Sequence, residues 1–526
     1  MEYHNLLGGA WLAANYGIEP IFPLQTVSRL GGRRATLVSE GITTEIYVES
    51  MRPSATLRGH LTFHLKHEMP NLELLSRLFV TIHPHELTAW IDDEPSGQYA
   101  KRVGFLYEFI TGRTLEIHSK ILGGYIAVLD DEKQVAASPE HTVLNQRWRV
   151  RDNLPGTSAF CPFIRKTNDA LRAINLDVKG LLEDLALEFG EELLMRSAVW
   201  MTLRESKSSF AIEGEANQTD RIQRFSDVLS RRTGQHPWPL TQAALASLQS
   251  EILGQRTTLQ TFGIRQSPVF VGEVARYQEV VHYIAPPTQD LAAMLEGLVT
   301  FLERTQGQSS VMRSAVAAFG FVYIHPLADG NGRVHRFLIN DVLRRDDVVK
   351  GPMILPVSSL ISRDQTERHA YQHILDTISR PLMQSLAGLY EFASTLTTYP
   401  DGVTSNFVFH GDDQARHTWR FPDFTQHVIY VAHILERTVL EDMRAESRYL
   451  RSHTQARSAI KDIIEMPDVQ LDRVIRSAQA NQGKLSNILL KEIPMLEEPG
   501  VWDEIVQAID IAFQHSEHNV SFTPNR

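Results

Sequence analysis

The 526-residue chain has a single cysteine, Cys161, and lacks both a long apolar run and an excess of positive charge. One cysteine cannot form an internal disulfide, so a disulfide framework is excluded and Cys161 is expected to be a small apolar packing residue. No apolar run reaches membrane-spanning length, and the first residues lack the basic segment of a secretory signal. We therefore expect a cytoplasmic protein with no membrane partner. The formal net charge of −11 disfavours nonspecific nucleic-acid binding.

The composition predicts a globular chain with several parts. Apolar residues make up 43% of it and charged residues 22%, which is enough for a large core. A chain of 526 residues is expected to form about three domains. The pattern of alternating and helical segments predicts a mainly α fold with a mixed α/β region first. The predicted parts are 1–160 (mixed α/β, of unknown role), 161–260 (helical), 261–400 (a helical core) and 401–526 (helical).

The N-terminal region combines short strands with helices and has an excess of histidine. Residues 35–38 and 43–48 alternate like strands, and 72–78 has helical spacing. The excess comprises His60, His64, His67, His83 and His85. His60 and His64 are one helical turn apart, so a zinc site is an alternative to ordinary core or surface histidines. Without cysteines or a His-Glu-x-x-His pattern, the ordinary role is favoured.

One short segment predicts a phosphate cradle. Gly330, Asn331 and Gly332 permit left-handed dihedrals, which would turn successive N–H groups into one concavity. Residues 333–343 have helical spacing, so the concavity should open at a helix N-terminus, where the free N–H groups favour phosphate. The preceding stretch, 319–324, is strongly apolar. The turn should therefore emerge from buried structure.

Charged side chains in the same segment predict chemistry on that phosphate. Arg333 and Arg336 stand three residues apart and should project over the same anion. Asp329 is a hard oxygen ligand placed for Mg²⁺. His325 is of a type that titrates near neutrality, so it could accept a hydroxyl proton. An ordinary solvated turn does not need these residue types at fixed offsets.

Residues 325–336, His-Pro-Leu-Ala-Asp-Gly-Asn-Gly-Arg-Val-His-Arg, resemble the signature of the Fic family, His-Pro-Phe-x-Asp/Glu-Gly-Asn-Gly-Arg-x-x-Arg. The departure is Leu327, where the family usually has Phe; this should alter packing more than chemistry. Fic enzymes typically transfer AMP from ATP to a protein Ser, Thr or Tyr hydroxyl. The resemblance implies a Fic-type helical core with a β-hairpin flap, ATP as substrate, Mg²⁺ as metal and a protein target.

Carried over by position, the resemblance gives each motif residue a role. His325 would be the catalytic base that deprotonates the target hydroxyl, and Asp329 would hold Mg²⁺ between the α- and β-phosphates. The implied ATP-binding residues are Gly330, Asn331, Gly332, Arg333 (β-phosphate side) and Arg336 (γ-phosphate). There is no Gly-Lys-Ser/Thr after the glycines, so this is not a Walker loop.

A second motif lies upstream, at the end of a helix predicted from about 186 to 208. Ser209, Glu213 and Gly214 match the family's inhibitory motif, Ser/Thr-x-x-x-Glu-Gly/Asn, although such a pattern often only borders a helix. In relatives with this class II arrangement, the residue at the place of Glu213 pairs with the one at Arg336. A carboxylate there would take the place of the γ-phosphate and repel ATP. The resemblance therefore implies self-inhibition.

Two β-branched runs, 268–272 and 280–284, predict a hairpin ahead of a helix that begins near Asp290. It resembles the Fic flap, which clamps the target segment by strand addition. The implied target-binding residues are Val280, Val281, His282, Tyr283 and Ile284. Further on, Tyr371 resembles an aromatic residue that borders the nucleotide in the family, with a core tyrosine as the alternative.

The C-terminal part has no catalytic motif. Residues 402–422 are polar and turn-rich, which predicts a linker or a loop excursion, and the chain is helical again from Phe424. Gly483 separates two helical patterns within 474–495. Helix–turn–helix packing without DNA is the favoured explanation, given the acidic balance of the chain.

The favoured function is a self-inhibited protein adenylyltransferase that modifies a partner or itself and releases pyrophosphate. One alternative is a hydrolase that removes AMP, in which the same Glu213 orients a water. Others are a transferase with another phosphate-containing donor, a non-enzymatic ATP-sensing regulator, and a transcriptional regulator built on the end regions. His325 argues against pure sensing, because binding needs no base. Many Fic proteins dimerise, so the resemblance also allows a homodimer.

Overall fold

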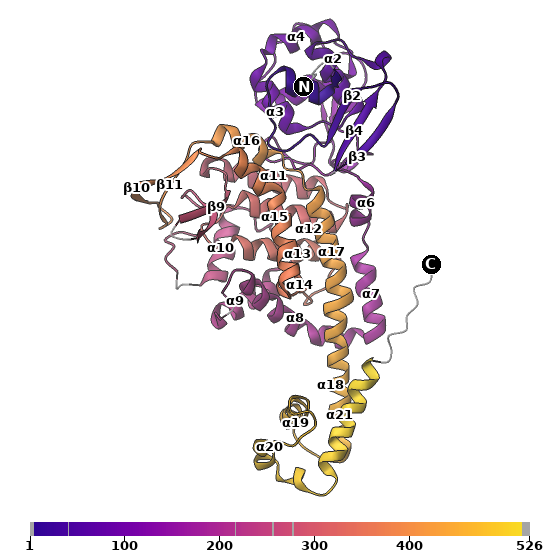
Figure 1. The fold of residues 1–526 in the computed structure, drawn as a ribbon, viewed down its shortest axis with the longest axis vertical. Helices are drawn as coiled ribbons and strands as arrows, with labels where there is room; N and C mark the ends of the chain where they lie inside the picture. Colours follow the sequence, from indigo (N-terminus) through magenta and orange to yellow (C-terminus); the bar gives the residue numbers. More distant parts are fainter. Residues whose placement is uncertain (1–4, 40, 216, 255–256, 276–277, 518–526) are drawn as a thin grey trace.

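The computed structural model describes residues 5–39, 41–215, 217–254, 257–275 and 278–517. The molecule is elongated and mainly α-helical: a mixed α/β unit lies at one end, a helical body in the middle and a small helical module at the other end (Figure 1). This confirms the predicted fold class. No helix in the described ranges is both long and apolar enough to cross a bilayer.

The N-terminal unit packs helices against a small sheet. The described strands have the order β1-β2-β4-β3, in which β2 and β4 run parallel and the other neighbours antiparallel. Its elements are β1 (Leu6–Leu7), α1 (Gly8–Asn15), β2 (Thr26–Leu30), β3 (Ala35–Ser39), β4 (Ile42–Tyr47), α2 (Leu57–His67), α3 (Leu72–Thr81), α4 (Pro84–Asp93) and α5 (Gln98–Thr111). The strands predicted at 35–38 and 43–48 and the helix at 72–78 are confirmed.

Two of the N-terminal histidines belong to the interior of this unit. His60 stacks on Trp11 with ring centroids 3.8 Å apart, and His64 Nδ1 lies 2.6 Å from Glu68 Oε2. Burial lowers the pKa of His60 to about 4, so its ring is neutral at physiological pH. These contacts give both side chains a packing role. A short sheet of β5 (Ile126–Ala127), β6 (Val143–Asn145) and β7 (Val150–Asp152) then leads into the body.

The helical body is one continuous hydrophobic core, which extends from Val135 to Met443. Cys161 is buried in the separate core of the N-terminal unit, as predicted for an apolar packing residue. The body's elements are α6 (Asn168–Ile174), α7 (Val178–Phe189), α8 (Glu191–Ile212), α9 (Thr219–Arg232), α10 (Gln242–Leu253), β8 (Phe270–Ala275), β9 (Gln278–Ile284), α11 (Thr288–Arg304), α12 (Ser310–Ile324), α13 (Asn331–Arg345), α14 (Val357–Ser362), α15 (Gln365–Ser385), β10 (Tyr390–Thr398), β11 (Thr404–Phe409), α16 (Asp412–Arg420) and α17 (Thr425–Arg437). Residues 161–260 and 261–400 thus share a core instead of forming separate bodies.

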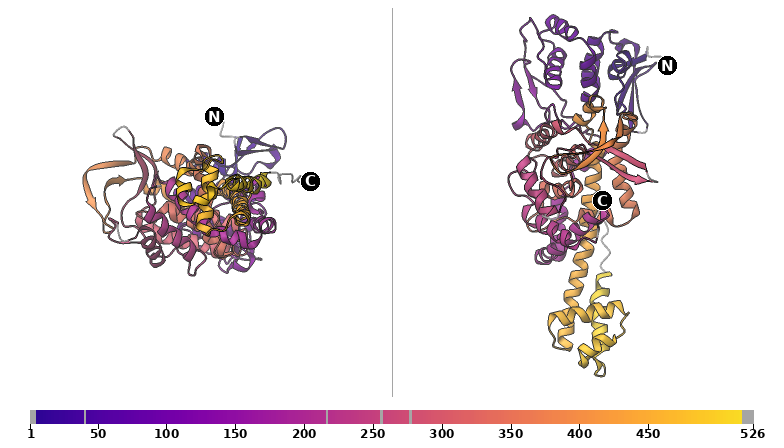
Figure 2. Two further views of the ribbon diagram at one scale, coloured as in Figure 1. Left: turned by 90° about the horizontal axis from the view of Figure 1, so that it is seen from below. Right: turned by 90° about the vertical axis from the view of Figure 1, so that its left-hand side faces the viewer.

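The predicted linker at 402–422 is wrong. This stretch contains β11 and α16, and β10 and β11 pair as a second antiparallel hairpin beside the β8–β9 hairpin (Figures 1 and 2). Phe392 and Phe407 of the second hairpin pack on Phe270 of β8, with ring centroids 5.4 and 4.8 Å apart. The turn-forming residues that suggested a linker are the tip of a hairpin that is fixed to the body.

The predicted helix from 186 to 208 is divided at Gly190. That residue adopts φ 90°, which a side chain would disfavour, so α7 ends before it and α8 begins after it. Helix α8 then continues to Ile212, four residues beyond the predicted end. The break re-aims the chain so that α8 packs against α13 and α14.

The C-terminal module is carried on one long helical rod. Helix α17 continues through a π-helical stretch, 438–443, into α18 (Arg444–Ile463), which leaves the body as Figures 1 and 2 show. Its other helices are α19 (Asp468–Ala480), α20 (Asn487–Glu492) and α21 (Val501–Glu517). A separate small core, which includes Leu471, Leu489 and Ile505, holds them together.

Gly104 of α5 tests the packing of the N-terminal unit. A Cβ built there would lie 2.2 Å from the Trp148 ring, which is fully buried. We expect Gly104→Ala to destabilise the unit, because overpacking costs about 1–3 kcal/mol and outweighs the gain of about 1 kcal/mol in helix propensity. Urea unfolding followed by tryptophan fluorescence measures the change. Gly124→Ala, where a Cβ meets no atom within 4 Å, is the control; equal midpoints for the two variants would contradict the packing argument.

Candidate functional site

The charged motif begins in the loop that joins α12 to α13, and two residues that bound this loop adopt a positive φ. His325 ends α12 at φ 51°, and Gly330 precedes α13 at φ 96°. Asn331 and Gly332 are already helical, so the prediction that all three cradle residues are left-handed is wrong for these two. A left-handed conformation costs a non-glycine residue about 1–2 kcal/mol, which the surrounding contacts of His325 must offset.

Asn331 fixes the shape of this loop. Its side-chain oxygen accepts a hydrogen bond from the Leu327 N–H at 3.0 Å, and its amide nitrogen donates to the Leu327 carbonyl at 2.7 Å. Both polar ends of the side chain are therefore committed to the backbone, so its part in phosphate binding would be to hold the loop that presents the amides. Leu327, the departure from the family pattern, is fully buried.

His325 is held as a neutral base. Its Nδ1 lies 3.0 Å from the Val322 carbonyl, which can only accept, so Nδ1 carries the proton and Nε2 keeps a free lone pair. Burial, together with the nearby charge of Arg265, lowers the pKa of His325 to about 4. The expectation that this side chain titrates near neutrality is therefore corrected: the imidazole is neutral throughout the physiological range.

Glu213 bridges the two motif arginines. Its Oε1 accepts from Arg336 Nη2 at 2.6 Å, and its Oε2 lies 3.2 Å from Arg333 Nε. Arg336 also donates to the hydroxyl of Ser209 at 2.7 Å and to the Ser209 carbonyl at 3.0 Å. The structure thus brings Ser209 and Glu213, at the end of α8, together with Arg336, which is more than a hundred residues further along the chain. Both arginines do face the same anion, which is a carboxylate of the chain itself.

The close approach of Glu213 depends on two glycines. A Cβ on Gly332 would lie 2.4 Å from Glu213 Oε1, so only glycine leaves room for the carboxylate at the start of α13. Gly214 adopts φ 77° directly after Glu213, which caps α8. This turn ends the helix and directs the carboxylate toward α13.

Arg333 is surrounded by three carboxylates. Besides Glu213, its guanidinium meets Asp329 at 2.8 Å and Glu215 at 3.5 Å. Its side chain is 2% exposed, yet within the described part of the chain its Nε and Nη1 have ion-pair contacts without hydrogen-bond geometry. Buried guanidinium donors without well-aligned hydrogen bonds are suited to bind an incoming oxyanion, provided that the carboxylates move aside.

Sequence reasoning missed two acidic residues next to this cluster. Glu215 contacts Arg333 and also Arg221 of α9, at 3.3 Å. Glu205 lies two turns before Glu213 on α8 and is fully buried, where its carboxylate accepts from the backbone and hydroxyl of Ser358. Burial raises its pKa to about 7, while Ser358 and the charge of Arg336 act to lower it.

Tyr371 of α15 lies beside the same arginine. It is buried, and its hydroxyl interacts with Arg336 in the interior next to Tyr430. Tyr371 is thus a buried core residue, as in the alternative interpretation, and its place beside a bound nucleotide stays a prediction. Burial raises the pKa of Tyr371, so the phenol remains neutral.

The predicted hairpin exists as β8–β9, but its five predicted target-binding residues divide between two faces. Val281, Tyr283 and Ile284 are buried against the body, and Tyr283 donates to the Tyr323 carbonyl at 2.6 Å. Only Val280 and His282 are exposed. The three buried side chains cannot touch a target, so strand addition here would depend on backbone groups and the two outward residues.

Asp329 is suited to Mg²⁺ held jointly with a nucleotide. Its side chain is about half exposed and has one oxygen bound to Arg333. No group of three His, Cys, Asp or Glu side chains in the described ranges could hold a metal without other ligands. Mg²⁺ usually takes one or two carboxylates and completes its shell with phosphate and water, so a single Asp fits that ion.

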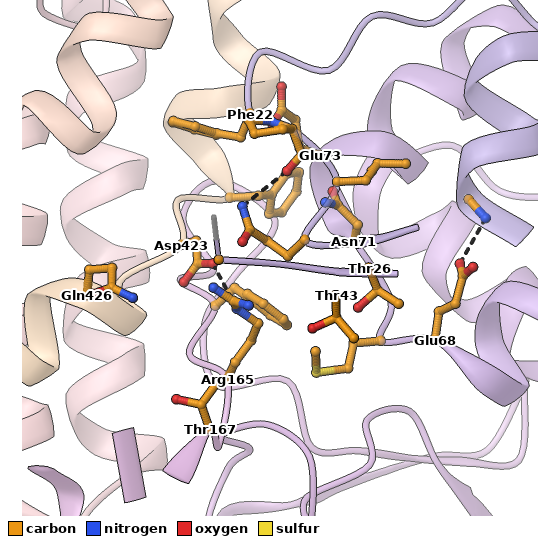
Figure 3. Close-up of a pocket in the computed structure, with 18 of the residues that line it drawn as sticks. Phe22, Thr26, Thr43, Glu68, Asn71, Glu73, Arg165, Thr167, Asp423 and Gln426 are labelled. Carbon is orange, nitrogen blue, oxygen red and sulfur yellow. Dashed lines mark hydrogen bonds and ion pairs between the residues drawn. The ribbon is translucent and has the colours of Figure 1, made fainter. Parts of the chain in front are cut away.

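A cavity of about 700 Å³ lies elsewhere, between the N-terminal unit and the body. Figure 3 shows that Thr26, Thr43 and Asn71 line one side and that Arg165 faces Asp423 on the other. The Arg165 and Asp423 side chains approach to 3.3 Å on that side. None of the residues predicted for the site lines this space, so the motif chemistry belongs to the α12–α13 loop.

Residues 239–343 match the model of the Fic/DOC family. The protein adenylyltransferase Fic of Drosophila mojavensis is 28% identical over 166 residues, which cover 30% of this chain and 29% of that protein. The protein adenylyltransferase fic-1 of Caenorhabditis briggsae is 29% identical over 132 residues, 25% of this chain and 23% of that protein. The chain thus spans less than a third of the length of these curated relatives.

A Fic family protein of known crystal structure, from Desulfovibrio desulfuricans G20, is 18% identical to this chain. The superposition covers 63% of this chain and 90% of that one with a TM-score of 0.39. This overlap is too loose to support an argument about the site.

The neutral state of His325 can be measured directly. Because burial lowers its pKa to about 4, we expect its Cε1–H resonance to stay unchanged as the pH falls from 8 to 5.5 and to move only near pH 4. An unperturbed histidine has a pKa near 6.5. The measurement is an NMR titration of protein with labelled histidine, in which the His325→Gln variant identifies the His325 signal. A midpoint above about pH 6 would show that the ring is not desolvated as described.

Proposed function

Because residues 239–343 form a Fic/DOC domain, we propose that the chain is a self-inhibited protein adenylyltransferase. It moves AMP from ATP to a Ser, Thr or Tyr hydroxyl of a protein and releases pyrophosphate. The observation that carries the proposal is the position of Glu213, whose carboxylate engages both arginines of the motif. The names of the matching relatives support the reaction, and the geometry supports the inhibition.

The proposed reaction uses the loop as a charge cradle and a base. Nε2 of His325 takes the proton of the target hydroxyl, whose oxygen attacks the α-phosphorus. The bond from that phosphorus to the bridging oxygen of the β-phosphate breaks, and pyrophosphate leaves. Amides at the start of α13 and the guanidiniums of Arg333 and Arg336 stabilise the phosphate charge, which is the main source of catalysis in such a transfer. Mg²⁺ held by Asp329 would neutralise phosphate charge when bound.

Inhibition follows from competition for the same guanidiniums. Glu213 supplies an oxyanion to Arg333 and Arg336 where phosphate oxygens are required, and Glu215 and Asp329 add two negative charges around Arg333. A triphosphate that enters this cluster meets like charge and lacks its arginine partners. ATP held under these conditions is displaced from the in-line geometry that the attack needs.

The same contacts bear on the direction of the reaction. In the reverse reaction, Glu213 would orient a water toward the bound AMP, with His325 serving the leaving hydroxyl. A non-enzymatic sensor would need the arginines but not the neutral His325. The proposed role of a partner protein, of self-modification and of a dimer rests on the family resemblance.

Glu213→Gly should raise AMP transfer about tenfold or more, because it frees both arginines for phosphate. The measurement is incorporation of label from α-labelled ATP with Mg²⁺ into the chain itself and into proteins of a cell extract. Addition of His325→Ala should abolish the label while ATP still binds, since the base is removed and the phosphate contacts remain.

Glu192→Gly, on the exposed face of the same helix, is the matched control and should leave transfer unchanged. Equal labelling by wild type and Glu213→Gly would refute inhibition. No label in any variant, together with release of AMP from a pre-modified protein, would favour the hydrolase. ATP binding without either reaction would favour the sensor.

Glu215→Gln should tighten ATP binding about threefold to tenfold. The substitution removes one negative charge 3.5 Å from Arg333 at a part-exposed position, where such pairs contribute on the order of 1 kcal/mol. Isothermal titration with Mg²⁺-ATP measures it. Glu251→Gln on α10, which breaks a comparable pair with Arg232 of α9, should leave the affinity unchanged. Weaker ATP binding by Glu215→Gln would mean that this carboxylate orders the site instead of opposing phosphate.

A further inference from the structure

Arg265 is buried just before the flap, and its hydrogen-bond partners among the described residues are all backbone carbonyls. Its Nε donates to the His325 carbonyl at 2.8 Å, its Nη1 to the Ser267 carbonyl at 2.7 Å and its Nη2 to the Pro286 carbonyl at 2.5 Å. Its own backbone N–H donates to the Pro326 carbonyl at 2.8 Å. The residue is 2% exposed. One side chain thus contacts three segments of the body.

Two of these bonds fix the turn that carries the base. His325 adopts the left-handed φ of 51°, and Arg265 holds the carbonyl of His325 as well as that of Pro326. The peptide planes on both sides of Pro326 are therefore set by one residue. Since the direction of a side chain follows from its backbone, Arg265 determines where Nε2 of His325 points.

The remaining bonds close the base of the flap. Ser267 precedes β8 and Pro286 follows β9, so the guanidinium of Arg265 joins the two ends of the β8–β9 hairpin. The plane of a guanidinium is rigid, and its donors diverge at fixed angles. The catalytic loop and the flap are thereby held at a set distance from each other.

Asp401, at the tip of the second hairpin, supplies the balancing charge. It is 1% exposed, and its Oδ2 accepts from the N–H groups of Gln266 and Ser267 at 2.8 and 2.9 Å and from the Ser267 hydroxyl at 2.8 Å. Burial acts to raise the pKa of Asp401, but these hydrogen bonds leave it below its ordinary value. A charged carboxylate is thus fixed to the two residues that follow Arg265.

We infer that Arg265, with Asp401 as its counter-charge, is a positioning residue that holds the base His325 in register with the flap. The inference rests on the proposed function, in which the target segment binds on the flap. Because the flap and the loop are held together, the hydroxyl of that segment would reach Nε2 of His325 in a fixed geometry. The inference also gives the second hairpin a part in the site, because Asp401 at its tip binds the two residues that follow Arg265.

The test compares Arg265→Lys and Arg265→Gln in the Glu213→Gly background. Lys keeps the charge but cannot reach three carbonyls in one plane, so kcat for AMP transfer should fall about 10- to 100-fold. KM for ATP should stay within about twofold, because the phosphate contacts come from other residues. Asp401→Asn should lower kcat in the same way but by less, about threefold to tenfold.

A second readout separates positioning from a general loss of structure. Arg265 adds to the effect of burial in lowering the pKa of His325. Arg265→Gln removes that charge, so the acid limb of the kcat/KM profile and the His325 resonance should both move to higher pH. In Arg265→Lys, which keeps the charge, both should stay close to their original positions.

Arg420→Lys is the matched control. Arg420, the last residue of α16, is also largely buried and donates to two carbonyls, those of Ser158 and of Ile110 in the N-terminal unit. It should leave kcat and the His325 titration unchanged. A loss in Arg265→Lys no larger than in Arg420→Lys, or a His325 midpoint that Arg265→Gln does not move, would overturn the inference. If no variant transfers AMP, the proposed function fails, and the His325 titration still decides the role of Arg265.

Discussion

The carboxylate of Glu213, held between Arg333 and Arg336, is the interaction on which the site depends. This pairing allows both arginine side chains to be buried in the body without an external ligand. A charge that is paired and hydrogen-bonded can be removed from water, whereas an isolated charge cannot. The break at Gly190, the turn at Gly214 and the bare Cα of Gly332 all serve this contact, since each gives the chain the path or the room that it requires.

The signature loop could be predicted because its chemistry is contiguous. The residue types and their spacing from His325 to Arg336 predict the phosphate cradle. The apolar stretch before them predicts burial, which α12 confirms. The pairing of Glu213 with Arg336 was accessible only through the family resemblance, since nothing in either local sequence specifies a partner 123 residues away. Glu205 and Glu215 illustrate the limit: their environments are made by α14 and α13, so they have no local pattern.

The errors have physical causes of the same kind. Gly190 lies inside a good helical pattern, yet its left-handed φ divides the helix. Residues 402–422 are turn-rich because they form the tip and flank of a hairpin, and a turn in a hairpin has the same composition as one in a linker. The shifted pKa of His325 follows from burial, which no residue type reveals. Propensity identifies elements, whereas long-range contact decides what surrounds them.

That the proposed inhibitory carboxylate belongs to the same chain as the arginines it binds has a kinetic consequence. Glu213 and the phosphate of ATP would compete for the same donors, but only the nucleotide has a concentration that can change. The local concentration of a tethered group is set by the chain and does not fall on dilution. The balance is therefore set by the ATP concentration against a fixed effective concentration of Glu213, and the latter changes only if the last turn of α8 moves.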